Sequence, residues 1–161
     1  MDPLFQCISA LPAGFRCKKK TSMSYIDIAY NACYGGFGLS QEARAMYLAQ
    51  CPDAAASPER LCASGLPRHD PVLARIVREL GSERASDRYA KVLLAQIPAC
   101  YVGHYTINEY DGTEDVVIEY NTYKVDQTRA ILGDRTTSKA EKLARIAAVM
   151  AMEDEEVREV E

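Results

Sequence analysis

The sequence lacks the residue groupings by which metal sites and many catalytic sites are recognised. Its six cysteines include no C-x-x-C pair, and its two histidines, His69 and His104, belong to no H-E-x-x-H motif. Structural zinc sites and metallohydrolases depend on such clustered ligands. We therefore predict no metal site and no cofactor.

The chain also has no long apolar run and no excess of positive charge. No segment approaches the roughly 20 apolar residues that a membrane-spanning helix needs. Asp2, Pro12 and Gly14 interrupt the apolar N-terminal residues, which is not typical of a secretory signal. The formal net charge of −4 argues against general nucleic-acid binding. We expect an intracellular protein with reduced thiols and no membrane span.

Glycine, by contrast, is concentrated in one short segment. Residues 31–40 read N-A-C-Y-G-G-F-G-L-S, so three of the nine glycines fall within four positions. We predict a strand before this loop, over 24–30, and a helix capped by Ser40 after it, over 41–50. Such a loop can present N–H groups to an anion at a helix N-terminus, or it can simply make a tight turn. Neither common glycine-rich phosphate-binding motif is present, which favours the tight turn.

Two further elements have clear local signals. A helix over 71–80 is predicted between Asp70, a good N-cap residue, and Gly81, a typical C′ residue. Its apolar positions repeat at helical spacing and define one buried face. These residues are Leu73, Ile76, Val77 and Leu80. The strand predicted over 91–97 is almost continuously apolar, which is typical of a central strand covered on both faces.

A β-hairpin is predicted from two segments of alternating polarity, 104–110 and 113–120. Between them lie Asp111 and Gly112, the preferred pair for a type I′ turn. Counting outwards from this turn predicts one apolar face on the hairpin. Its residues are Tyr105, Ile107, Val116, Ile118 and Tyr120.

The same register places Glu109 directly opposite Glu114. Like charges in a cross-strand pair cost a few tenths to about 1 kcal/mol, so the pair needs an explanation. A cation, an arginine or a shared proton between the carboxylates would supply one. Alternatively, both side chains splay into solvent, or a bulge changes the register.

These elements predict an α+β domain over residues 23–124, with a small, mainly antiparallel sheet and two packing helices. Residues 1–22 are predicted to be an apolar and basic N-terminal extension. Residues 125–161 are predicted to hold a connector, an amphipathic helix and an acidic tail. This appended C-terminal helix begins with a capping box at 138–141. One of its faces carries Leu143, Ile146, Ala147, Met150 and Ala151.

Several motifs of the domain occur in a recognisable order. They are Asn31-x-Cys33-Tyr34-Gly35-Gly36-Phe37, Arg68-x-Asp70-Pro71, Leu80-Gly81, Ile97-Pro98 and Tyr105-x-Ile107-x-Glu109-Tyr110-Asp111-Gly112-x-Glu114. In this order and spacing, residues 24–120 resemble a short, uncharacterised protein family of tailed phages and large DNA viruses of eukaryotes. The resemblance implies a viral origin but no particular chemistry. Residues 1–22 and 121–161 are additions to the family's usual pattern, which favours functions that the additions supply.

We rank first the function of a non-enzymatic viral structural or protein-interaction protein. The apolar N-terminal extension, its basic cluster and the appended helix are surfaces that neighbouring chains explain better than a pocket does. The expected partners are other copies of the chain, or viral or host proteins. The expected location is the cytoplasm of the infected host cell or the virion.

Two other functions remain open. In the first, Tyr34, Gly35, Gly36, Phe37, Gly38 and Arg68 sequester an anionic, nucleotide-like molecule. Arg68 would otherwise form a salt bridge to Asp70 or a neighbouring carboxylate. In the second, the chain is a cysteine-dependent enzyme with Cys33 as nucleophile and His104 or His69 as base. Cys33 would otherwise be a small apolar core residue.

Overall fold

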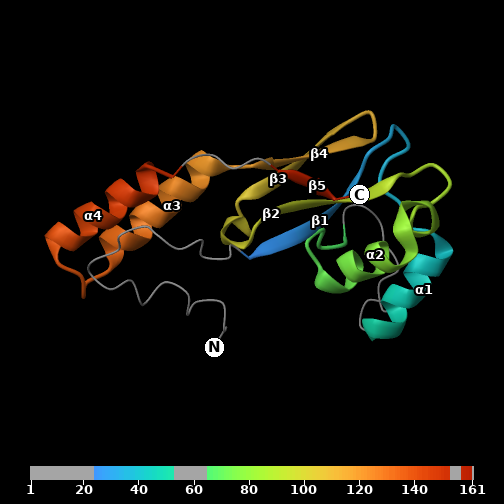
Figure 1. The fold of residues 1–161 in the computed structure, drawn as a ribbon, viewed down its shortest axis with the longest axis horizontal. Coiled ribbons are helices and arrows are strands. Elements are labelled where there is room, and N and C mark those ends of the chain that lie inside the picture. Colours follow the sequence, from blue (N-terminus) through green and yellow to red (C-terminus); the bar gives the residue numbers. More distant parts are fainter. Residues whose placement is uncertain (1–23, 53–64, 153–156, 161) are drawn as a thin grey trace.

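The computed structural model describes residues 24–52, 65–152 and 157–160, and it has the predicted α+β fold (Figure 1). Its elements are β1 (Tyr25–Asn31), α1 (Gln41–Gln50), α2 (Pro71–Ala85), β2 (Val92–Pro98), the 3-10 helix η4 (Ala99–Tyr101), β3 (Tyr105–Tyr110), β4 (Thr113–Ile118), α3 (Tyr120–Gly133), α4 (Lys139–Met150) and β5 (Arg158–Val160). The predicted N-terminal extension, 1–22, lies outside the described residues.

β2 is the central strand of a three-stranded antiparallel sheet with the order β1-β2-β5. Leu94 of β2 lies opposite Ala29 of β1, and both pack into the core on one face of the sheet. Ile97 belongs to the core on the other face. The near-continuous apolar run of β2 is therefore explained, as predicted, by cover on both faces.

Different elements cover the two faces of the sheet. On one face, α1 and α2 supply the buried residues Ala43, Tyr47, Leu73, Ala74, Ile76, Val77 and Leu80. On the other face, Ile28 and Ile97 pack with Tyr101 of η4, Ile118 of β4 and Tyr123 of α3. The hairpin and the start of α3 therefore belong to the domain core.

The predicted hairpin forms with the predicted register, but the four predicted strands are divided between two sheets. Asp111 and Gly112 have φ values of 51° and 83°, as a type I′ turn requires. β3 and β4 form a two-stranded sheet of their own, and β4 packs beside β1. The side chains of Arg68 and Glu114 form hydrogen bonds with the backbone of β1 on the edge that faces the hairpin.

α2 follows the prediction up to Gly81 and then continues. The Asp70 side chain caps the helix by accepting a hydrogen bond from Val72 N at 2.7 Å. Gly81 has a φ of 71°, so the helical backbone breaks there before a further turn ends at Ala85. The predicted helix therefore ends before Gly81, as predicted, and the residues up to Ala85 are a short second helical segment within α2.

The C-terminal region differs most from the predictions. The connector is largely the 14-residue helix α3, so the predicted domain boundary between 124 and 125 is wrong because it falls inside a helix. Tyr120 begins α3 instead of extending β4. Part of the predicted acidic tail forms β5, because residues 158–160 pair with residues 94–96 of β2.

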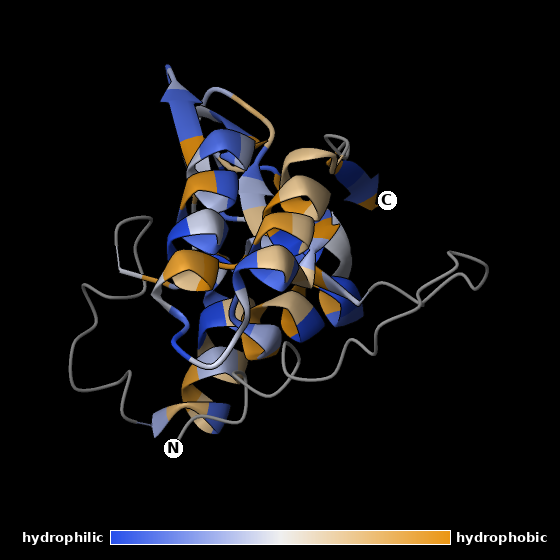
Figure 2. Ribbon diagram, turned by 90° about the vertical axis from the view of Figure 1, so that its left-hand side faces the viewer, coloured by the Kyte–Doolittle hydropathy of each residue, from blue (hydrophilic) through white to orange (hydrophobic). Residues whose placement is uncertain are grey.

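α3 and α4 form a helical hairpin at one end of the molecule, where α4 packs along α3 (Figure 1). Figure 2 views the molecule from this side and shows hydrophobic residues on the helices nearest the viewer. α4 begins at the predicted cap, where Ser138 Oγ accepts a hydrogen bond from Glu141 N. None of its 12 residues is buried.

The core that joins the sheet to the hairpin and α3 gives a first prediction. Ile97→Ala removes a fully buried side chain from this core and should lower the free energy of unfolding by about 2–5 kcal/mol. Val117→Ala, at a strand residue that is 41% exposed, should have a much smaller effect. Chemical denaturation measures both changes, and equal losses would contradict the assignment of Ile97 to the core.

Candidate functional site

The glycine loop between β1 and α1 is held between two other backbone segments. A Cβ atom on Gly35 would lie 1.4 Å from the carbonyl oxygen of Tyr89. A Cβ atom on Gly112, in the turn of the β3–β4 hairpin, would lie 2.5 Å from the carbonyl oxygen of Tyr34. Real Cβ atoms are not found at such distances, so both positions require glycine for close backbone approach. The glycines therefore bring the loop against the hairpin turn and the segment before β2.

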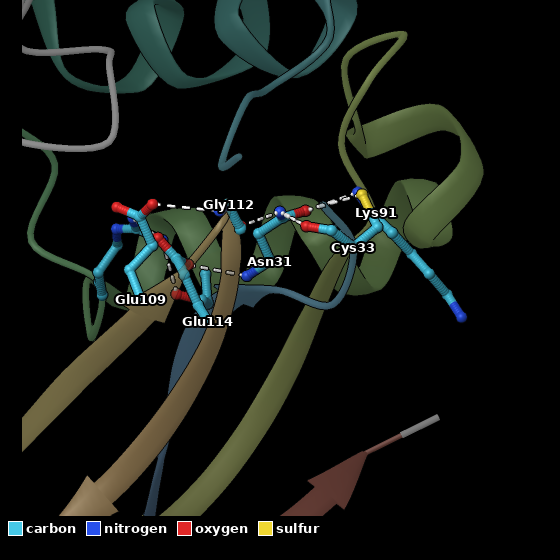
Figure 3. Close-up of polar contacts among 8 residues, drawn as sticks. Asn31, Cys33, Lys91, Glu109, Gly112 and Glu114 are labelled. Carbon is cyan, nitrogen blue, oxygen red and sulfur yellow. Dashed lines mark hydrogen bonds and ion pairs between the residues drawn. The ribbon is translucent and has the colours of Figure 1, made fainter. Parts of the chain in front are cut away.

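Asn31, the last residue of β1, is fully buried and ties these segments together (Figure 3). Its side-chain Nδ2 donates to the carbonyl oxygens of Cys33 at 2.5 Å and Gly112 at 2.7 Å. Its Oδ1 accepts from Lys91 N at 2.8 Å. Its backbone N–H donates to Glu114 Oε2 at 2.8 Å. One amide side chain thus satisfies backbone groups of the loop, the hairpin turn and the segment that enters β2.

Beside Asn31, Arg68 and Glu114 form a buried, bidentate ion pair. Arg68 Nη1 lies 3.0 Å from Glu114 Oε2, and Arg68 Nη2 lies 2.7 Å from Glu114 Oε1. The two residues are only 8% and 5% exposed. Arg68 Nη1 also donates to the carbonyl oxygen of Ala29 at 3.2 Å, and the guanidinium lies 3.5 Å from the ring centroid of Phe37. Both charges are therefore neutralised and hydrogen-bonded within the fold.

This ion pair explains the two opposed glutamates of the hairpin. Glu109 lies opposite Glu114 in the register, but it is exposed, and its Oε1 accepts from Gly112 N at 3.1 Å. Glu114 is buried and binds Arg68. The arginine therefore neutralises Glu114 alone and does not lie between the two carboxylates, because Glu109 is exposed. Asp70, the alternative partner for Arg68, instead accepts hydrogen bonds from Val72 N and Tyr47 Oη.

The residues predicted to capture an anion lie near one another but serve other contacts. Tyr34 is 73% exposed, whereas Phe37 is partly buried against the Arg68 guanidinium. The positive charge of Arg68 is already balanced by Glu114. Gly35 packs against the backbone at Tyr89. Anion capture at this loop remains a prediction that the geometry does not favour.

Cys33 has no adjacent histidine in the described part of the chain. Its Sγ lies 3.2 Å from the carbonyl oxygen of Tyr89 and 3.5 Å from Asn31 Oδ1. His69 Nδ1 is hydrogen-bonded to Tyr105 Oη at 2.6 Å, and the His104 ring packs edge-on against Tyr123. Both histidines therefore make other contacts, and neither is hydrogen-bonded to the Cys33 thiol as the base of an activated thiol nucleophile would be.

Among the described residues there is no group of three or more His, Cys, Asp or Glu side chains able to hold a metal ion. Cys33, Cys51 and Cys100 form no disulfide with one another. No helix in the described ranges is long and apolar enough to cross a membrane.

No family model, curated protein or solved structure matches the chain. The resemblance to viral proteins therefore remains a prediction.

Sequence reasoning missed the role of Asn31 and the pairing of Arg68 with Glu114. A partial signal existed for Glu114, because strand alternation put it on the apolar side of the hairpin, where an ionised group needs a partner. No comparable signal identified Arg68 as that partner, since the two residues are 46 positions apart in the chain. Asn31 resembled an ordinary loop residue because it directly precedes the glycine loop.

The buried ion pair generates the second prediction. Arg68→Met should lower the free energy of unfolding by about 3–5 kcal/mol, because it leaves the Glu114 carboxylate buried without a counter-charge. The double variant Arg68→Met/Glu114→Leu should be more stable than Arg68→Met alone, because it buries no unpaired charge.

Arg129→Met is the matched control for this experiment, because Arg129 pairs with Asp126 at the surface. It should change the stability little. Chemical denaturation at constant pH measures all three variants. If Arg68→Met were as mild as Arg129→Met, the ion pair would not hold the hairpin in place.

Proposed function

We propose that the chain is a non-enzymatic protein-interaction protein that binds another protein chain through the outer face of α4. This outer face consists of Ala140, Leu143, Ala144, Ala147, Met150 and the C-cap residue Ala151, all of which are exposed. The observation that carries the proposal is an apolar face of α4 that is exposed within the described part of the chain.

Two of the large apolar residues of α4 are exposed. Leu143 and Met150 are 60% and 57% exposed. Ile146 and Val149, at positions facing α3, are partly buried. A helix that packs its apolar residues on a single neighbour normally carries polar residues on the opposite side, and the outer face of α4 has none.

The end of α4 has no polar residue on any side. Residues 146–151 read Ile-Ala-Ala-Val-Met-Ala, so more than a full helical turn carries no polar side chain. A helix that is apolar all round is normally buried. The extent of this uncovered surface supports a contact with another chain.

The α3–α4 hairpin is held firmly enough to present this surface. In the turn between the helices, Asp134 accepts hydrogen bonds from Thr136 and Thr137 and lies 3.5 Å from Arg145. The hydrogen bonds from these threonines hold the pKa of Asp134 well below its usual value, so its carboxylate stays charged in acid that would protonate an ordinary aspartate. Lys142 Nζ donates to the carbonyl oxygen of Leu132 at 2.9 Å, which joins α4 to the end of α3.

Aromatic packing attaches the base of α3 to the domain. The Tyr123 ring lies edge-on to Tyr101 at 4.8 Å and to His104 at 5.2 Å between ring centroids. Tyr101 also packs edge-on with Tyr120. A surface presented on anchored helices loses little conformational entropy on binding, which favours specific association.

The predicted viral origin extends the proposal to the location of the chain. A protein-binding helix on a small domain suits a component of a virion or a factor in the infected cytoplasm. Of the two other functions, the cysteine enzyme lacks a histidine hydrogen-bonded to Cys33 among the described residues, and an anion would have to compete with Glu114 for Arg68.

Site-specific photocrosslinking in cells that naturally produce the chain tests this proposal. A photoreactive amino acid replaces Leu143 or Met150 in the full-length protein, and Val117, which is also exposed and apolar, serves as the control position. We expect discrete crosslinked protein species from both α4 positions and none from the control. An absence of species from α4, or an equal yield from Val117, would contradict the proposal.

A further inference from the structure

We infer that the chain bound at the outer face of α4 is a second copy of this protein, packed with its α4 antiparallel to the first. The inference rests on the function proposed above and names its partner. Three properties of α4 support it: the spacing of its small residues, the placement of its two large apolar residues, and its charges.

The small residues of the outer face fall on one line along the helix. Ala140, Ala144, Ala147 and Ala151 are separated by four, three and four positions, which is the a/d spacing of a helix–helix seam. Alanine at these positions lets two helices approach to the short end of the usual interaxial range. Because both copies present the same line, the contact is self-complementary, as a two-fold dimer requires.

An antiparallel arrangement brings these residues into register. When Ala144 of one copy faces Ala147 of the other, Ala140 faces Ala151 at the two ends of the seam. Leu143 and Met150 lie together on one side of the line, seven positions apart. In the antiparallel pair, Leu143 of each copy therefore lies beside Met150 of the other, and all four large side chains become covered.

The charges of α4 favour the antiparallel direction. Lys139 is the first residue of the helix, where its own helix macrodipole disfavours a cation, and the last turn of the helix carries no basic residue. Antiparallel packing places Lys139 of each copy beside the C-terminal end of the other α4, where a cation is favoured. Parallel packing would bring the two lysines and the two N-termini together. The outer face itself carries no charged side chain, so pairing buries no ion.

The test is sedimentation equilibrium of the full-length chain over a wide concentration range. The wild type should show a reversible monomer–dimer equilibrium. Leu143→Glu places a carboxylate in the apolar contact and should raise the dimer dissociation constant by at least about tenfold. Val117→Glu puts the same charge on an exposed apolar residue of β4 and should leave the equilibrium unchanged.

The double variant Leu143→Glu/Met150→Lys tests the direction of packing. In the antiparallel dimer each introduced carboxylate lies beside an introduced ammonium group of the other copy, so the dissociation constant should return to within a few-fold of the wild-type value. In a parallel two-fold dimer the introduced charges of the two copies lie on opposite sides of the seam, so no such pairs form and the dimer stays weakened. Circular dichroism of each variant verifies that the helix content is retained.

The outcomes separate this inference from the proposed function. A wild-type chain that stays monomeric at every concentration overturns the inference, while crosslinks from α4 to a different protein would retain the proposed function. A dimer that Leu143→Glu leaves unchanged overturns the inference, because the contact then lies elsewhere. A dimer weakened by Leu143→Glu but not restored by the double variant overturns the antiparallel arrangement.

Discussion

The buried ion pair between Arg68 and Glu114 connects parts of the fold that share no backbone ladder. β1 needs a neighbour on its outer edge, because unpaired strand edges are costly when buried and prone to association when exposed. Arg68 supplies one, with its carbonyl oxygen accepting from Ala29 N at 2.8 Å and its guanidinium donating to Ala29 O. Glu114 binds the next outward-facing group, the N–H of Asn31. The pair thus takes the place of a fourth strand and fixes the hairpin beside the sheet.

This arrangement explains why the loop between β1 and α1 is rich in glycine. Glycines before a helix N-terminus are equally compatible with an anion site and with close backbone packing. Here the loop approaches the Tyr89 carbonyl at Gly35 and meets the hairpin turn at Gly112. The arginine that would have served an anion is paired with Glu114 inside the protein. Packing within the domain therefore explains the glycine loop, whereas no described segment covers the exposed Leu143 and Met150 of α4.

Local signals account for the parts of the structure that could be predicted from sequence. The cap at Asp70, the positive φ at Gly81 and the Asp111-Gly112 turn depend on a few adjacent residues, and all three are present. α3 was not predicted because it has no side-chain N-cap to mark its start. Its position is fixed by tertiary contacts, through Tyr123 and through packing along α4. β5 is only three residues long and exists through its pairing with β2. The Arg68–Glu114 pair likewise forms only in the assembled fold, so no short sequence pattern predicts it.

The chain therefore consists of a packed domain and the α3–α4 hairpin, whose exposed apolar face we propose to bind a second copy. Amide hydrogen exchange of the full-length protein, followed by NMR at low and high concentration, tests this division directly. The amide of Asn31, bonded to Glu114, should exchange slowly at both concentrations, whereas the amides of α4 should become more protected as the concentration rises. Fast exchange at Asn31, or protection of α4 that does not change with concentration, would contradict the account.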